Sequence, residues 1–142
     1  MMRAGTWRKL AWVYAAGFLG VFLVTHTPGL SDVEGRLFGL FKIDPIDDVA
    51  HLLSGLAGAL VAGWATRHLS LYFKVIGVAY GLDVVVGMAL SRGFLDLSVF
   101  TQGPGAADLS LRNFLLNAPH IPISVIALVA GFCRPASQHA AP

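Results

Sequence analysis

Three of the five histidines in this chain of 142 residues are placed where they could form one polar cluster. His26 ends the first long apolar stretch, His51 lies early in the second, and His120 opens the last. Asp47 precedes His51 by four residues, so both side chains share a helix face and the carboxylate could fix the imidazole tautomer. Three imidazoles could also bind zinc or copper. Hydrated histidines at a membrane surface need no ligand, however, and we expect no metal site.

Small residues lie beside His51 on the same helix face, because Ser54, Gly55 and Gly58 follow it at helical spacing. An imidazole next to such a groove meets the needs of an axial ligand to a haem or a chlorophyll. The three histidines of the cluster are therefore candidate cofactor ligands. The alternative, that they bind nothing, stays open.

Asp83 lies inside an apolar run, residues 75–90, where a carboxylate costs roughly 2.5–3.5 kcal/mol on insertion scales. It must therefore face other helices and be paired, hydrogen-bonded or protonated. Its partner could be Ser54, a histidine of the cluster or a residue of another protein. Two roles remain open: a proton relay or ion ligand, and a structural hydrogen bond that fixes the helix register.

The last apolar stretch begins with two prolines, Pro119 and Pro122, around His120. Pro119 suits a first helical turn, but Pro122 removes a backbone hydrogen bond. We expect a helix that starts near His120 and is short, or one that is kinked at this end. Carbonyls freed beside Asn117 and His120 need partners, so this is the segment where an unusual site would be found, with a plain kink as the alternative.

Four apolar stretches, with nearly all charges between them, must position these residues. Only 13% of the residues are charged and 56% are hydrophobic, which is too little charge to cover a soluble domain. A membrane core about 30 Å thick needs about 20 apolar residues per helix. The sequence therefore predicts an all-α integral membrane protein with four transmembrane helices, over residues 10–24, 49–65, 71–90 and 114–132.

The four predicted spans form two similar hairpins within one membrane domain, residues 1–142. Half one covers 1–66, half two covers 67–134, and 135–142 form a short cytoplasmic tail. The second and fourth spans begin alike, Asp48-Val-Ala-His51 beside Asn117-Ala-Pro-His120, as an internal repeat would. Chance similarity between two apolar sequences is the alternative.

Short interfacial helices are predicted in both external joints. Ser31 and Glu34 have the spacing of a capping box. Asp44 as N-cap, with Pro45 at the first helical position, starts the second span. Four apolar residues of the first joint share a helical face, Val33, Leu37, Leu40 and Phe41, and the matching piece of the second joint comprises Phe94, Leu95, Leu97, Val99 and Phe100. Residues 102–107 are expected to form a loop.

The basic residues predict that both termini are cytoplasmic. Six of the ten lysines and arginines flank one face of the predicted bundle with no acid among them, whereas the other two joints mix bases with acids. The positive-inside rule assigns the first face to the cytoplasm. The six residues are Arg3, Arg8, Lys9, Arg67, Lys74 and Arg134.

Small residues recur at every fourth position of the predicted spans, which lets helix backbones approach closely in lipid. Small residues cover so wide an arc of the second span that we expect this helix to contact two neighbouring helices. The residues predicted to pack in this way are Gly55, Gly58, Ala59, Gly63, Gly77 and Gly81.

The segment 47–55, Asp-Asp-Val-Ala-His-Leu-Leu-Ser-Gly, follows Leu-Phe-Gly-Leu-Phe at 37–41. With these segments, and with 73–80 as a similar third helix, the chain resembles a family of uncharacterised small bacterial four-helix membrane proteins. The resemblance covers most of residues 35–132. Pro119 and Pro122 depart from the family pattern, and the expected glycine after the histidine is absent. The resemblance implies a topology and a bacterial inner membrane, and no activity.

Composition and motifs favour a protein that is not an enzyme. Four spans leave no room for a soluble catalytic domain, no nucleophile–base or phosphate-binding motif is present, and the basic residues form no face for nucleic acid. Cys133 is the single cysteine and is expected to act as a small apolar residue. We expect an accessory or scaffold subunit that packs against other membrane helices. The alternatives are a haem- or chlorophyll-binding subunit and a small proton-coupled transporter that uses Asp83.

Overall fold

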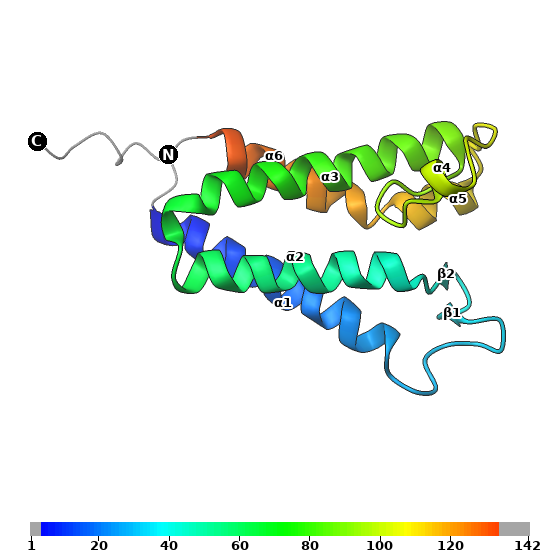
Figure 1. Ribbon diagram of the computed structural model, residues 1–142, viewed down its shortest axis with the longest axis horizontal. Coiled ribbons are helices and arrows are strands. Elements are labelled where there is room, and N and C mark those ends of the chain that lie inside the picture. The colour runs from blue at the N-terminus through cyan, green and yellow to red at the C-terminus, as the bar shows by residue number, and fades with distance from the viewer. Residues whose placement is uncertain (1–3, 134–142) are drawn as a thin grey trace, which may run out of the picture.

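The computed structural model describes residues 4–133, of which 69% are helical, and this confirms the predicted helical class. Three long helices, α1 (Ala4–Thr25), α2 (Pro45–Gly63) and α3 (Leu69–Leu90), run along the molecule (Figure 1). Two shorter helices, α5 (Leu111–Asn117) and α6 (His120–Phe132), pack along α3. The small elements are the 3₁₀ helix η1 (Thr66–His68), the single turn α4 (Ser98–Thr101), and the strands β1 (Arg36–Leu37) and β2 (Phe41–Lys42).

Helices long and apolar enough to cross a membrane account for most of the described chain. Three qualify alone, Gly5–Thr25, Pro45–Gly63 and Thr66–Leu90. A fourth span results if α5 and α6, which meet at a bend of 43°, are taken together. Large apolar side chains are exposed along the helices, as lipid would require. The structure thus supports a membrane protein with three or four spans, and the arrangement of four spans in two hairpins stays a prediction.

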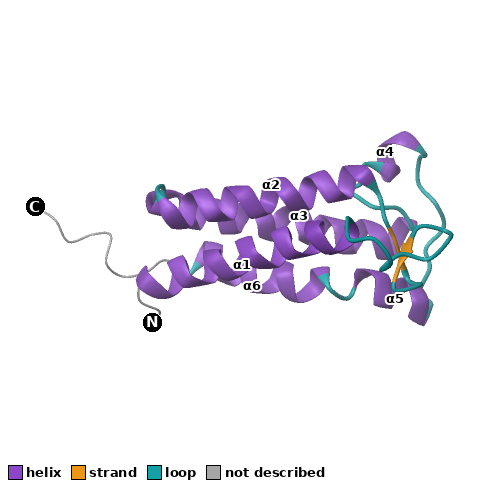
Figure 2. Ribbon diagram, turned by 90° about the horizontal axis from the view of Figure 1, so that it is seen from below, coloured by secondary structure: helices purple, strands orange, loops and turns teal. Residues whose placement is uncertain are grey.

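Two helix pairs make up the bundle: α1 packs along α2, and α3 packs along α6 (Figure 1). Figure 2 shows the bundle from below, with the strands, α4 and α5 gathered at one end. Glycines permit both contacts. A Cβ atom at Gly55 would lie 2.7 Å from Cγ of Leu19, and one at Gly77 would lie 2.8 Å from Cγ of Leu128. Of the other residues predicted to pack, Gly58 and Gly81 would each place a Cβ 2.7 Å from a hydroxyl oxygen, of Tyr72 and Ser124, whereas Ala59 and Gly63 are half-buried.

The two pairs meet mainly through aromatic rings. Phe18 of α1 stacks on Tyr80 of α3 with ring centroids 4.9 Å apart. Nearer the chain ends, Tyr14 meets Phe73 edge to face at 5.5 Å, and Trp7 packs on Phe73 at 6.1 Å. All five side chains are buried, so they form the core between the pairs.

The bundle has two different ends. At one, Arg8 Nε donates to the carbonyl of Ala62 and Ser70 Oγ donates to the carbonyl of Gly131, each at 2.7 Å. We call this the terminal end, because the described chain begins and finishes there. The opposite end, which carries the hairpin β1–β2, α4 and α5, is the loop end (Figure 1). Of the basic residues predicted for one face, Arg3 and Arg134 lie outside the described residues.

Helix α2 begins as predicted. The carboxylate of Asp44 accepts hydrogen bonds from the amides of Ile46 and Asp47 at 2.8 and 3.2 Å, and Pro45 occupies the first helical position. An oxygen acceptor at the N-cap satisfies amides that have no partner within the helix, and proline needs no such partner. The predicted cap is therefore confirmed.

The prediction of an interfacial helix in the first joint is wrong. Residues 31–42 form turns and the antiparallel hairpin β1–β2 instead. The carboxylate of Asp32, rather than a Ser31 capping box, accepts the amides of Glu34 and Arg36 at 2.9 and 2.8 Å. Gly35 has a φ of 72°, a left-handed conformation that interrupts a right-handed helix and that glycine adopts without strain.

The interfacial piece predicted for the second joint is reduced to the single turn α4. Side chains compete with a longer helix here, because Gly93 N donates to Ser98 Oγ and Ser98 N donates to Asp96 Oδ1, each at 2.8 Å. Leu97, with a φ of 61°, precedes the turn in a left-handed conformation. The expected loop at 102–107 is confirmed, since no helix or strand continues past Thr101 until α5.

Helix α6 shows both consequences expected of its prolines. It starts at His120, and the chain bends by 43° between α5 and α6. Helix α6 has 13 residues, so it is shorter than the predicted apolar stretch. Of the freed carbonyls, that of Ala118 accepts a hydrogen bond from the amide of Ile121 at 3.3 Å.

Gly77→Ala tests the contact between α3 and α6. We expect it to lower the free energy of unfolding by about 1–3 kcal/mol, because the added methyl would also lie 2.8 Å from the backbone nitrogen of Leu128. The matched control is Gly20→Ala on α1, where a Cβ meets nothing within 4 Å. Unfolding in detergent, followed by circular dichroism, measures both, and equal stability of the two variants would contradict this packing.

Candidate functional site

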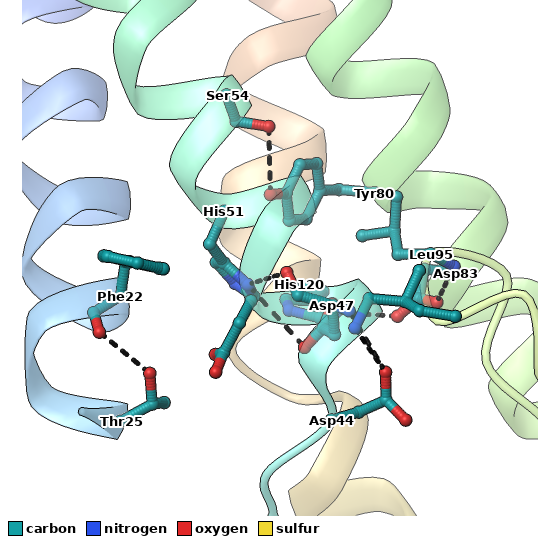
Figure 3. A network of polar contacts seen from close by, with 12 residues as sticks. Phe22, Thr25, Asp44, Asp47, His51, Ser54, Tyr80, Asp83, Leu95 and His120 are labelled. Atoms are coloured by element: carbon teal, nitrogen blue, oxygen red, sulfur yellow. Dashed lines mark hydrogen bonds and ion pairs between the residues drawn. The ribbon is translucent and has the colours of Figure 1, made fainter.

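Three helices bring titratable side chains together at the loop end. Helix α2 supplies Asp47 and His51, α3 supplies Asp83, and α6 supplies His120 at its first position (Figure 3). The two imidazole rings lie next to each other, tilted by 41°, with centroids 5.9 Å apart. These four residues, all singled out from the sequence, are the polar cluster of the site.

His26 stands apart from this cluster. Its side chain is 54% exposed at the end of α1, and its Nδ1 lies 2.8 Å from the carbonyl of Phe22. The nearest carboxylate oxygen is Oδ2 of Asp48 at 3.9 Å. The structure therefore brings together two of the three predicted histidines.

Asp83 is fully engaged despite its burial. Its Oδ2 lies 2.8 Å from Nδ1 of His120, and its Oδ1 accepts the amides of Phe94 and Leu95 at 2.7 and 2.9 Å. Hydrogen bonds to the charged form offset the cost of burying a carboxylate. Among the three partners considered from the sequence, the structure shows the histidine. The two loop amides were missed, because only the folded joint brings them to Asp83.

Hydrogen bonds select the tautomers of both rings. His51 Nδ1 lies 2.9 Å from the backbone carbonyl of Asp47 and 3.6 Å from the Asp47 carboxylate. A carbonyl or carboxylate oxygen only accepts, so in each neutral ring Nδ1 carries the hydrogen and Nε2 keeps a lone pair. The carbonyl, rather than the expected carboxylate, orients His51. His120 is held in the same tautomer by Asp83.

Tyr80 packs against both histidines of the cluster, and it was not predicted from the sequence. Its ring meets His51 and His120 edge to face, with centroid distances of 5.9 and 5.1 Å. Its hydroxyl donates to Ser54 Oγ at 3.2 Å (Figure 3), so Ser54 serves this tyrosine rather than Asp83. An aromatic residue one turn from Asp83 on the same face was the available signal.

A cavity of about 840 Å³ extends from the cluster. His51, His120, Asp47 and Asp48 line its polar part at the loop end. Its apolar part continues between α1 and α6, along Val13, Gly17, Val21, Pro122 and Ile126. We call this apolar part the slot. The site is thus amphipathic, with hydrogen-bonding groups at one end and hydrocarbon along its length.

The groove predicted beside His51 is filled by protein. Leu19 of α1 packs against Gly55, and the Tyr72 hydroxyl packs against Gly58. In the part of the chain that the structure describes, no group of three or more histidine, cysteine or acidic side chains is arranged to hold a metal ion. The open space of the site lies on the cavity side of the two rings instead.

Asn117, also predicted as part of a site, makes a structural contact. Its Nδ2 donates to the carbonyl and to Oδ1 of Asn113 at 2.9 and 3.2 Å, and its side chain packs on Gly87. Asn113 Nδ2 in turn donates to the Gly87 carbonyl at 3.1 Å. The pair fixes α5 against the end of α3, where both asparagines line the cavity.

The cluster can bind donors or accept a proton at Nε2 of either ring. Among the described residues, no hydroxyl or thiol is hydrogen-bonded to His51 or His120, so the paired nucleophile and base of many hydrolases do not occur here. Comparisons of the chain with protein-family models, with curated proteins and with solved structures find no match. The resemblance to a bacterial four-helix family therefore stays a prediction.

Asp83→Ala is expected to lower the free energy of unfolding by about 1–3 kcal/mol, because it leaves two buried amides and an imidazole N–H without an acceptor. Asp83→Asn should cost less, since its amide oxygen can still accept from the loop. Asp108→Ala, which removes one bond to an exposed amide of Ser110, is the control. Denaturant unfolding in detergent ranks the three, and an Asp83→Ala variant as stable as the control would refute this role.

Proposed function

We propose that the chain crosses a membrane four times, with α5 and α6 as one broken span and both termini in the cytoplasm of a bacterial cell. The support is the common position of the first and last described helix ends, which an even number of crossings requires. Arg8, Lys9, Arg67 and Lys74 belong to this terminal end, and all eight acids lie in or beside the loop-end joints or in the cavity. The halves 1–66 and 67–134 then form two hairpins.

Cysteine labelling tests this topology. Cys133 is exposed and is the single cysteine of the sequence. With a membrane-impermeant maleimide on intact cells, Cys133 should react only after the membrane is opened. Ala106→Cys in a Cys133→Ala background should react at once, because residue 106 lies in the second external joint. If Cys133 and residue 106 were labelled from the same side, α5–α6 would not be a span.

We infer that the protein binds an amphiphilic molecule at the outer side of the membrane. The single observation that supports this function is the cavity, in which His51, His120 and Asp48 lie at one end of an apolar slot. A lipid-like molecule has the same division, a polar head group and a hydrocarbon tail. Ligand cavities of proteins commonly combine a mostly apolar lining with a few placed polar groups.

The slot suits the hydrocarbon tail of an amphiphile, because the helices that form the slot would be flanked by lipid. Val13 and Val21 of α1 and Ile126 of α6 line it, and Val13 and Ile126 are among the exposed large apolar residues. Tyr14 Oη donates to the carbonyl of Ile123 at 2.6 Å, which ties α1 to α6 at the deep end of the slot. A bound molecule would enter sideways from the bilayer and stop at this bond.

Binding is better supported than transport. Toward the terminal end, the space beyond the cluster is occupied by the packed rings of Phe18, Tyr80, Phe73 and Trp7. A proton-coupled transporter based on Asp83 would need a polar path through this layer. The accessory or scaffold role also stays a prediction, because the exposed apolar faces that a partner would cover are equally suited to lipid.

Filling the slot tests the function. Gly17→Phe places a ring where a Cβ meets nothing within 4 Å on the cavity wall, so the protein should fold and purify with less bound amphiphile. Gly20→Phe is the matched control on the same helix, equally free of neighbours and outside the cavity lining. Native mass spectrometry of protein extracted in mild detergent measures the retained molecule. Equal retention by both variants, or none by the unmodified protein, would refute binding in the slot.

A further inference from the structure

Asp48 is a buried carboxylate without a hydrogen-bond donor among the described residues. Its side chain is 9% exposed and lines the cavity. The nearest basic nitrogen, His26 Nδ1, is 3.9 Å from Oδ2, which is too far for a hydrogen bond. That nitrogen already lies 2.8 Å from the Phe22 carbonyl. A carboxylate removed from water needs a donor, so the cavity side of Asp48 is where a ligand would supply one.

The free polar atoms of the two histidines and of Asp47, which line the cavity with Asp48, are also acceptors. His51 and His120 use Nδ1 for Asp47 and Asp83, which leaves the Nε2 lone pair of each ring free. The carboxylate of Asp47 makes no hydrogen bond within the described chain, and its closest ring nitrogen is 3.6 Å away. Asp48, Asp47 and His51 lie within one turn of α2, and all three side chains line the same cavity.

The remaining charged groups near the cluster are already engaged or lie at the rim. The carboxylates of Asp44 and Asp96 accept backbone amides at 2.8 Å. Arg92, a cation in the lining of the same cavity, donates from Nε to the carbonyl of Gly103 and from Nη1 to that of Ser91 at 3.3 and 3.2 Å. Lys42, on β2, is exposed and lines the same cavity, so it provides a cation at the entrance.

We propose that the cavity selects an amphiphile whose head group carries a primary ammonium beside a phosphate. An ammonium offers three donors and a positive charge, which the Asp48 carboxylate and neighbouring acceptors of the lining, the Asp47 carboxylate and the Nε2 atoms, can bind. Lys42 at the rim pairs with the adjacent phosphate, and the tails occupy the slot. This inference rests on the proposed amphiphile-binding function and adds the chemistry of the head group.

Three phospholipids with equal acyl chains test the head group on the unmodified protein. Phosphatidylethanolamine has the primary ammonium, phosphatidylcholine keeps the charge without N–H donors, and phosphatidylglycerol has no cation. Titrated into delipidated protein in detergent and measured by native mass spectrometry, the ethanolamine lipid should bind about tenfold more tightly than either of the others. Because this series uses only the unmodified protein, it tests the head-group preference even if a variant fails to fold.

Asp48→Asn should abolish the preference while retaining the fold. The substitution preserves shape and removes a charge that has no hydrogen-bond donor among the described residues, so the melting temperature should stay equal or rise. Binding of phosphatidylethanolamine should fall about tenfold, to the level of phosphatidylcholine. Asp108→Asn, in a loop outside the cavity lining, should leave both the preference and the melting temperature unchanged.

The outcomes separate this inference from the proposed function. A preference for the ethanolamine lipid that Asp48→Asn removes and Asp108→Asn keeps would support it. Equal binding of all three lipids, still blocked by Gly17→Phe, would overturn the ammonium assignment and leave amphiphile binding in place. A preference for phosphatidylglycerol would also overturn it. If no lipid bound, or if Gly17→Phe left lipid binding unchanged, both the ammonium assignment and the proposed amphiphile binding would be overturned.

Discussion

Asp83 is the group on which the loop end of the bundle depends. Its two carboxylate oxygens join three segments that are far apart in sequence: α3 itself, the first turn of α6 through His120, and the start of the second joint through Phe94 and Leu95. A carboxylate at this depth persists only when its hydrogen bonds are complete. Because each bond also positions a wall of the cavity, the same interaction that holds the fold holds the candidate site.

The bundle combines two kinds of helix contact, which differ in how much added side-chain volume they tolerate. Within each pair, backbones approach at glycines such as Gly55 and Gly77, where one added carbon meets a neighbour at under 3 Å. Between the pairs, whole rings such as Phe18 and Tyr80 separate the backbones. Close backbone contact fixes the geometry within a pair, whereas rings leave room beside them. The cavity therefore lies between the pairs and not within one.

Sequence reasoning succeeded where the signal was local. The start of α2 at Asp44 and Pro45, and the start of α6 at His120, depend on neighbouring residues alone. It failed in the first joint, because the spacing of apolar residues matched a helix while Gly35 and the Asp32 carboxylate set turns. Local side-chain bonds outcompeted apolar periodicity there.

The candidate site was predicted in part, for a related reason. The composition of the cluster was available from the sequence, because histidines and an acid in apolar runs are unusual. Which of the neighbouring acids is more deeply buried was not, since it depends on how α2 is rotated: Asp48 is buried, whereas the Asp47 side chain is one-third exposed. The loop amides on Asp83 depend on the path of the folded joint, which no pattern in α3 encodes.

The hydrogen bond from Tyr14 to the Ile123 carbonyl limits the length of hydrocarbon chain that the slot can hold. Phe18, whose ring centroid lies 5.9 Å from that of His51, follows Tyr14 by four residues, which corresponds to about 6 Å of helix. A hydrocarbon chain that starts beside His51 can extend only that far toward the terminal end before it meets the hydrogen bond between Tyr14 and Ile123. A longer chain has to turn out between the helices, so its terminal carbons would contact the bilayer rather than protein.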